Sequence, residues 1–244
     1  MSAEIAILQS LSRNPFDYEK AFCCIPKNLR MMFIHAVQSL IWNKATSHRM
    51  SKMDNTKALI GDLISNPKKV ENSTESKVHI VTEEDVEASK YTMEDVLVPI
   101  VGTKTVFPTN ELGSVLKGLL SDLGLTIDMF QKCRDREVRA NGDYRKAIIH
   151  PKDFDYTIQE YYHPLQPLLQ TDLMKLNGEE IAIEPPQKSE EQENEAESSS
   201  SPPKPLVAMV VGFTLPSSSY ATIALRELMK TPTSNEFQSK LKLE

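Results

Sequence analysis

The sequence predicts an α/β fold in the broad sense that includes α+β proteins, and three patterns lead to this class. Residues 26–50 carry one uninterrupted helical period of apolar side chains. Residues 96–101 and 206–214 are apolar, β-rich runs of strand length. From Tyr144 onward the pattern changes from helical to strand-like. We therefore expect strands and helices packed around the long helix.

Composition is typical of a globular protein. The chain has 244 residues, 40% apolar and 25% charged, which is enough for one large domain or two small ones. It has no apolar run of about eighteen residues, and residues 1–20 lack the regions of a signal peptide. Cys23, Cys24 and Cys133 do not have metal-ligand spacing. We expect a soluble, intracellular protein with reduced thiols and no membrane partner.

The N-terminal part contains a short helical pattern and then the long helix. The short pattern lies in residues 1–20 and ends at an Asn-Pro turn signal. Pro26 suits the first turn of the long helix, where its missing N–H is no loss. The helix also carries Gln38 and Trp42, whose polar groups need partners if they are buried. A core helix with satisfied polar groups is the simplest interpretation.

Short elements are expected between the long helix and residue 96. Residues 51–77 are polar and without a sustained period, which predicts a loop with one strand-like fragment. Residues 77–81 form a short strand candidate. Thr82 then caps a short helix over residues 82–89, whose acidic first turn favours the positive end of the helix.

An apolar strand and two helices follow. Pro99 interrupts the run 96–101, and this suggests a bulge or an edge position, because proline cannot donate to a strand ladder. Asn110 caps an amphipathic helix that ends at Gly124. A second helix over residues 126–134 completes a compact subdomain.

The C-terminal part is expected to contain strands and one helix. The strand candidates cover residues 145–150, 155–163 and 206–214. The last of them is apolar enough for a central strand. A helix over residues 220–230 is expected to begin at a serine cap, Ser217 or Ser218.

The net charge of −6 is concentrated in one segment. Residues 179–204 hold eight glutamates and two lysines, so the rest of the chain is neutral. The acidic, serine- and proline-rich stretch at about 184–205 buries too little apolar surface to offset its ordering entropy. We predict that it is a disordered excursion between two strands.

A local excess of four positive charges lies in residues 130–152. Such an excess is typical of a stripe that faces phosphates, and a solvated face of mixed charge gives the same pattern. The candidate phosphate contacts are Lys132, Arg134, Arg136 and Arg139. A metal site is not expected, because the five histidines are scattered and form no H-E-x-x-H.

Four motifs in chain order link the sequence to a known family. The long helix contains Q-S-x-x-W-N at residues 38–43. Residues 94–108 read D-V-x-x-P-x-x-G-x-x-x-x-x-P, and residues 141–151 read G-x-Y-R-K-x-I-x-x-P. Residues 213–229 read F-x-L-P-x-x-x-Y-A-T-x-x-x-R-E. On these motifs the chain resembles the eukaryotic branch of the TruD-type pseudouridine synthase family.

The resemblance implies an RNA-modifying isomerase that uses an aspartate, with neither cofactor nor metal. The enzyme detaches a uracil from its ribose, rotates it and rejoins it through carbon. In the family the aspartate lies in G-T-K-D-R-R, followed by N-x-F-G-x-Q-R-F, upstream of the long helix, and neither motif is present here. Residues 102–104 match its first three letters, but Thr105 replaces the aspartate and has no base near it in sequence. We expect no catalytic residue in this chain.

The resemblance also places six residues beside the active-site cleft. These RNA-binding or pocket-wall candidates are Tyr144, Arg145, Lys146, Phe213, Leu215 and Tyr220. The first three would contact RNA phosphate or the absent aspartate, and a solvent-exposed strand edge explains them as well. The last three would line an apolar wall, although ordinary core is the alternative for Phe213 and Leu215.

The domain organisation follows from these assignments. We expect an N-terminal segment with the long helix (1–54), an insertion subdomain (55–140), C-terminal strands and helix of the catalytic core (141–234) and a tail (235–244). The fold would then be a partial pseudouridine synthase sheet with the TruD-specific insertion.

Two functional hypotheses stay open. In the first, the parent protein isomerises uridine in tRNA, mRNA or other RNA. This chain would then be its C-terminal portion, inactive alone, with the missing N-terminal half as a partner in the nucleus or cytoplasm. In the second, the chain is a non-catalytic RNA-binding module.

Overall fold

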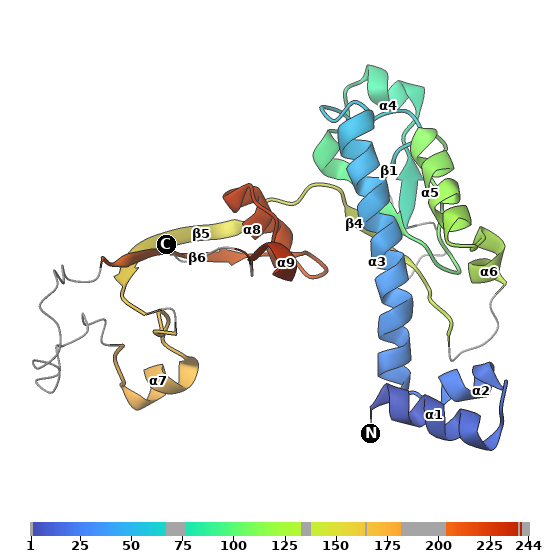
Figure 1. Ribbon diagram of the computed structural model, residues 1–244. Coiled ribbons are helices and arrows are strands. Elements are labelled where there is room, and N and C mark those ends of the chain that lie inside the picture. Colours follow the sequence, from blue (N-terminus) through green and yellow to red (C-terminus); the bar gives the residue numbers. More distant parts are fainter. Residues whose placement is uncertain are drawn as a thin grey trace, which may run out of the picture. The chain divides into compact units, whose positions relative to one another are not determined.

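The computed structural model of the chain is shown in Figure 1. It describes residues 2–66, 77–132, 138–163, 165–181, 204–238 and 240. By their contacts these residues divide into two compact units, Met1–Ile149 and His150–Glu244, and each is described by itself. The acidic stretch predicted at about 184–205 lies almost wholly outside the described residues.

Three helices open the first unit. They are α1 (Ala3–Arg13), α2 (Tyr18–Cys23) and α3 (Lys27–Lys52). The predicted long helix is confirmed as α3, and Pro26 occupies its N-cap position. Sequence periodicity did not indicate α2, which has six residues and is capped by Asp17.

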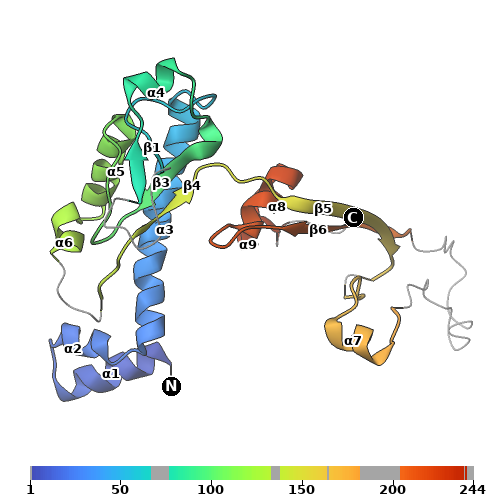
Figure 2. The same cartoon turned by 180° about the vertical axis from the view of Figure 1, so that it is seen from behind.

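A four-stranded antiparallel sheet lies beside α3. Its strands are β1 (Leu63–Ser65), β2 (Val78–Ile80), β3 (Val96–Ile100) and β4 (Asp143–Lys146), in the order β2-β1-β3-β4. Figure 2 labels β1, β3 and β4 beside α3. The strand predicted over residues 145–150 is observed as β4, which begins two residues earlier and is shorter. The backbone N–H of Ala147 still reaches Val96, but β3 has no residue beyond Val96 to continue the ladder.

The proline in β3 sits where only one side of the strand is paired. Strand β1 pairs with Val96 and Leu97 and extends no further along β3. Pro99 pairs with Tyr144 of β4 alone. The edge position predicted for Pro99 is therefore correct for this residue, although β3 as a whole is an interior strand.

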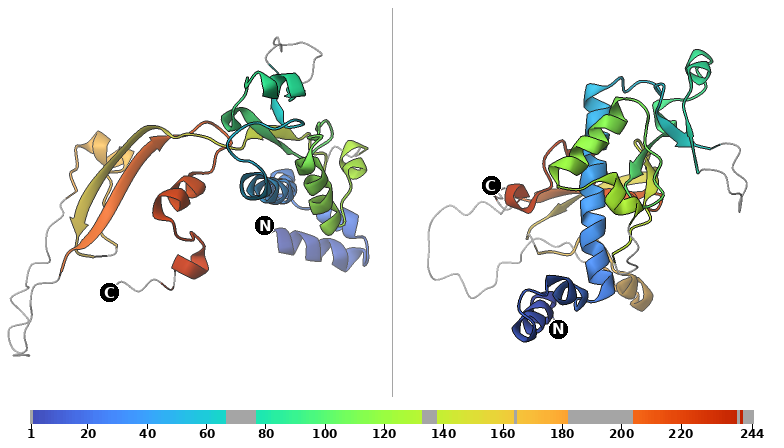
Figure 3. Two further views of the ribbon diagram at one scale, coloured as in Figure 1. Left: turned by 90° about the horizontal axis from the view of Figure 1, so that it is seen from above. Right: turned by 90° about the vertical axis from the view of Figure 1, so that its right-hand side faces the viewer.

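Four further elements lie in the described residues of the first unit. They are α4 (Glu83–Glu87), η1 (Met93–Asp95), α5 (Glu111–Asp122) and α6 (Ile127–Gln131). The predicted caps are confirmed: the Thr82 hydroxyl accepts from the Asp85 N–H, and the side-chain Oδ1 of Asn110 accepts from the Leu112 N–H. Helix α5 packs alongside α3 (Figure 3), and α3 also contacts β3. The long helix therefore shares one packing unit with the segment 55–140, and the catalytic-core and insertion assignments stay predictions.

The core lies on both faces of the sheet. Ile64 and Val96 belong to one apolar cluster, whereas their neighbours Leu63 and Leu97 belong to another. Successive strand residues point to opposite faces, so this alternation shows that the short strands are covered on both sides. Every buried apolar side chain of the described part of the chain lies in the first unit.

The second unit is built on two long strands. They are β5 (Lys152–Tyr161) and β6 (Leu206–Thr214), an antiparallel pair that runs side by side in Figure 3. Three helices accompany them, α7 (Asp172–Asn177), α8 (Ala221–Met229) and α9 (Asn235–Gln238), of which α7 and α9 were not expected. Within the described residues β6 pairs with β5 only, so the central position predicted for it is not seen here.

The serine cap predicted for the helix over residues 220–230, which is α8, is wrong. Tyr220 occupies the N-cap position of α8 and makes no side-chain cap hydrogen bond. Ser218 lies in a left-handed turn with φ of 65° before the helix. Both serines precede the cap position, and a cap must sit at that position for its side chain to reach the free N–H groups.

A candidate RNA interface on the first unit

The Q-S-x-x-W-N motif fixes the position of β3. Gln38 Nε2 donates to the Val101 carbonyl oxygen at 2.5 Å, and Trp42 Nε1 donates to that of Val98 at 3.0 Å. Both side chains are buried, and they lie one helical turn apart on α3. The His35 ring completes the row by bonding Gln38 Oε1 at 2.8 Å. The motif therefore holds β3 and the residue that follows it, which lie inside the second motif.

The second and third motifs cross each other at two glycines. A Cβ on Gly102 would lie 2.1 Å from the Gly142 nitrogen, so only glycine fits at this position. Gly142 has φ of 75°, and a Cβ there would lie 2.4 Å from Thr105 Oγ1. Backbone bonds tie the crossing, from the Thr103 N–H to the Ala140 oxygen at 2.9 Å and from the Lys104 N–H to the Asn141 oxygen at 3.4 Å.

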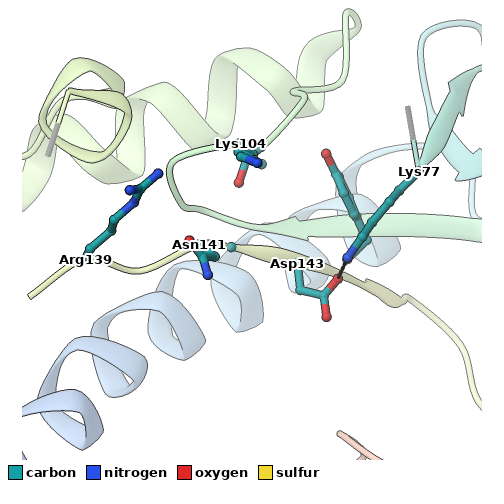
Figure 4. Close-up of a pocket in the computed structure, with 8 residues that line it drawn as sticks. Lys77, Lys104, Arg139, Asn141 and Asp143 are labelled. Carbon is teal, nitrogen blue, oxygen red and sulfur yellow. Dashed lines mark ion pairs between the residues drawn. The ribbon is translucent and has the colours of Figure 1, made fainter. Parts of the chain in front are cut away.

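A pocket of about 590 Å³ opens at this crossing (Figure 4). Among the residues that the structure describes, its charged lining consists of three cations and one carboxylate. The lining residues are Lys77, Lys104, Thr105, Arg139, Asn141, Gly142, Asp143 and Tyr144. The net charge of the lining is thus positive, which suits an anionic ligand such as a nucleic acid backbone.

Tyr144 is a predicted site residue that lines the pocket. A hydrogen bond and partial burial explain its role. Its hydroxyl oxygen accepts a hydrogen bond from the Val106 N–H at 2.7 Å. Burial raises the pKa of the Tyr144 phenol, and the charge of Asp143 adds to the rise, although the Val106 N–H acts against it. The phenol therefore stays neutral at physiological pH and anchors the 101–106 loop.

The next two residues of β4 have different surroundings. The Arg145 guanidinium lies 5.7 Å from the centre of the Trp42 ring, a cation–π distance. Arg145 is half-buried, whereas Lys146 is exposed. The predicted exposed-edge alternative fits Lys146, and Arg145 supports the packing of α3 against the sheet.

The four candidate phosphate contacts do not form one stripe in the described residues. Arg139 lines the pocket. Lys132 forms an i,i+4 ion pair with Asp128 on α6. Arg134 and Arg136 lie outside the described residues.

The remaining three candidates belong to the second unit. Phe213 of β6 stacks on Phe154 of β5, with ring centroids 6.4 Å apart and planes 10° apart. Leu215 and Tyr220 are half-buried, and both precede α8 in the sequence. Their role as a pocket wall stays a prediction.

Sequence reasoning missed several pocket residues, namely Lys77, Lys104, Asn141 and Asp143. The signal for Lys104 and Asn141 was present, because each stands within two residues of a motif glycine. Lys77 stands directly before β2 and far in the sequence from the other lining residues, so no local signal pointed to it. Within the described part of the chain, no cluster of His, Cys, Asp or Glu could hold a metal ion, and no helix is long and apolar enough to span a membrane.

Comparisons with known proteins agree on one family. The family model described as tRNA pseudouridine synthase D (TruD) matches residues 1–169. Multisubstrate pseudouridine synthase 7 of Schizosaccharomyces pombe is 31% identical over 99% of this chain and 36% of its own length. The human pseudouridylate synthase 7 homolog is 32% identical over 91% of this chain and 29% of its own length.

A solved structure supports the same assignment. The crystal structure assigned to tRNA pseudouridine synthase D (TruD) from Methanosarcina mazei superposes with a TM-score of 0.57 at 25% identity. The match covers 94% of this chain and 44% of that chain. The chain therefore spans about a third of the length of the curated relatives described above and under half of the solved structure.

Proposed function

The chain belongs to the TruD family of tRNA pseudouridine synthases, and from this premise we propose that it is the C-terminal portion of an RNA pseudouridine synthase. In the proposed reaction the bond between uracil N1 and ribose C1′ breaks, the uracil rotates, and a C5–C1′ bond forms; C5 loses its proton to water and N1 takes one up. The observation that carries the proposal is the set of four family motifs in order along one chain.

We assign no catalytic residue to this chain. The family's G-T-K-D-R-R and N-x-F-G-x-Q-R-F motifs are absent from the sequence. Thr105, which stands after G-T-K, donates its hydroxyl proton to the Ile100 carbonyl oxygen at 3.1 Å and is 7% exposed. Its hydroxyl is thus occupied in holding the loop crossing. The nucleophilic aspartate has to come from another part of the synthase, and this chain alone is inactive.

The chain's role in the reaction is to hold RNA beside the cleft. Target uridines must leave their stack to react, so the enzyme needs a grip on the backbone that is independent of the base. Arg139 and Lys146 are exposed and cationic, and they suit this role. Phe213, Leu215 and Tyr220 are proposed as one wall of the uracil pocket. The proposed partners are tRNA or mRNA and the N-terminal half of the synthase, in the nucleus or cytoplasm.

The direct test is the intact mass of the endogenous protein. An antibody against residues 231–244 would capture it for mass spectrometry. A mass well above the 27.5 kDa of this chain, with a peptide that contains G-T-K-D-R-R, is the expected result. A mass near 27.5 kDa would overturn the assignment to an active synthase.

A second candidate function, a non-catalytic RNA-binding module, has one structural feature in its favour. The first unit holds a core on both faces of its sheet and needs no further strand to cover it. The mass measurement separates the two candidates, because a module requires that the cell makes the short chain. RNA binding without pseudouridine formation by that short chain would then favour the module.

A further inference from the structure

We propose that the pocket at the Gly102–Gly142 crossing binds a backbone phosphate of RNA, and that Lys104 and Arg139 hold it. The inference rests on the proposed function in that RNA is the ligand. It goes beyond that function by assigning the contact to one pocket and two cations, and by giving a third residue, Asp143, an opposing role.

The charges of the pocket favour this assignment. Lys77 is already matched, because its Nζ lies 3.6 Å from the Asp143 carboxylate (Figure 4). Among the described residues, neither the Lys104 ammonium nor the Arg139 guanidinium has a hydrogen-bond or ion-pair partner. Of the described lining residues, two unmatched cations therefore share one hollow with a carboxylate that is already paired. A phosphodiester is the anion that an RNA-binding protein meets most often.

Hydrogen bonds fix the backbone positions of the two cationic residues relative to each other before the ligand arrives. Lys104 and Arg139 stand on different loops, and three bonds join these loops around the glycine crossing. They are Thr103 N–H to Ala140 O, Lys104 N–H to Asn141 O, and Val106 N–H to Tyr144 Oη. Since the loops are tied together, the pocket loses little conformational entropy on binding.

The size and lining of the pocket indicate that it does not recognise the base sequence of the RNA. A volume of about 590 Å³ is larger than one phosphate group needs. The described lining offers charge and a few polar groups, and Tyr144 is the one aromatic ring in it, so it holds no pair of rings to clamp a base. The pocket is therefore suited to fix the position of the strand and is not suited to read its sequence.

Asp143 should weaken the same contact. Its carboxylate is 65% exposed and lies in the pocket lining, where it repels a phosphate and neutralises Lys77. Replacing it with asparagine keeps the shape, removes the repulsion and frees the Lys77 ammonium. A gain of affinity on this change cannot come from misfolding, so it is the sharpest test of the pocket.

The experiment measures binding of an unmodified tRNA transcript to the 244-residue chain over a range of salt concentrations. The variants are Lys104→Ala/Arg139→Ala, Asp143→Asn, and the charge-matched control Lys44→Ala/Lys117→Ala, whose lysines are exposed and lie outside the pocket. The double pocket variant should make the salt dependence shallower by about 1.4 to 1.8 in log–log slope, the value for two phosphate contacts. Asp143→Asn should raise affinity about threefold, as expected for removing one charge about 7 Å from a phosphate in water. The control should lose much less slope.

Each other outcome overturns the inference in a recognisable way. If the transcript binds and neither pocket variant changes affinity or slope, the pocket is not a phosphate site, and the synthase proposal is untouched. If uridine monophosphate or inorganic phosphate binds with the same dependence on Lys104 and Arg139 while the transcript does not, the pocket serves a small anion and not RNA. If the chain binds no RNA at all, the inference fails, and the synthase proposal is decided separately by the mass of the endogenous protein. Equal thermal unfolding of all variants excludes a folding defect.

Discussion

At the scale of single residues, one buried ion pair connects three segments of the first unit. Arg49 and Asp62 are both fully buried, and Arg49 Nη2 lies 2.7 Å from Asp62 Oδ2. Arg49 also donates to the carbonyl oxygens of Asp54 and Lys57, and Asp62 accepts from Asn110 Nδ2 at 2.9 Å. The pair thus joins the end of α3, the following loop and the cap of α5.

Removing one partner of this pair should be costly. Asp62→Ala leaves the Arg49 guanidinium buried without its carboxylate, and such a change costs about 3–5 kcal/mol of unfolding free energy. Lys77→Ala breaks the exposed pair with Asp143 and should cost at most about 1 kcal/mol. Urea unfolding followed by circular dichroism checks both values. A small loss for Asp62→Ala would contradict this role of the pair.

The glycine crossing gives a second prediction at the residue scale. Gly102→Ala forces a Cβ against the Gly142 backbone, so we expect a loss of about 1–3 kcal/mol and disruption of the pocket. Gly118→Ala is the matched control, because Gly118 lies within α5 with no atom within 4 Å of its added Cβ. Helix propensity predicts a gain of about 0.5–1 kcal/mol there. Thermal melts of both variants should therefore shift in opposite directions, and equal shifts would refute the crossing geometry.

At the scale of elements, local capping determines the short helix α4. The Thr82 N–H donates to Asp85 Oδ2 at 3.2 Å, and the Asp85 N–H donates to the Thr82 hydroxyl at 3.3 Å. His79 of β2 bonds the same carboxylate oxygen at 2.7 Å. The hydrogen bond with His79, followed by that of the Thr82 N–H, lowers the pKa of Asp85 well below its ordinary value.

The depressed pKa predicts how stability depends on pH. The ordinary pKa of an aspartate is about 3.9, and the folded value lies below it, so Asp85 stabilises the fold above about pH 4. That contribution is lost as the pH falls further. Asp85→Asn should lower the melting temperature at pH 6 and flatten its dependence on pH between 5 and 2. Asp122→Asn, at the exposed end of α5, serves as control. An unchanged pH profile for Asp85→Asn would contradict the prediction.

The elements that sequence predicted well are those whose signals are local. The period of α3, the caps Thr82 and Asn110 and the apolar run of β6 each determine their own element. The short helices α2 and α7 have six residues each, too few for a period to be recognised. The pocket was not predictable, because Lys77 lies far in the sequence from the other lining residues and only the tertiary fold brings it to them.

At the scale of the whole chain, the two units differ in burial. The second unit exposes Phe154, Tyr156 and Ile158 on β5 and Met209 on β6. Register places Tyr156 opposite Val211 and Ile158 opposite Met209, so these side chains share one face of the sheet. A two-stranded sheet is only marginally stable by itself, and an apolar face of this kind calls for a cover. The proposed N-terminal half of the synthase would supply it.

Amide hydrogen exchange can test this difference. In the 244-residue chain, the β5 and β6 amides should exchange much faster than those of α3 and β3, which surround the buried core. In the endogenous protein, β5 and β6 should gain protection while α3 and β3 change little. Equal protection of both units in the short chain would show that the second unit needs no cover.

Tritium release from labelled uridine tests whether the endogenous protein that contains this chain makes pseudouridine. The endogenous protein, captured through residues 231–244, is incubated with tRNA transcripts that carry tritium at uracil C5. Because C5 loses its hydrogen when it joins ribose, isomerisation releases tritium to water. We predict release by the captured protein and none by the 244-residue chain alone. A captured protein that binds the transcripts and releases no tritium would contradict the account.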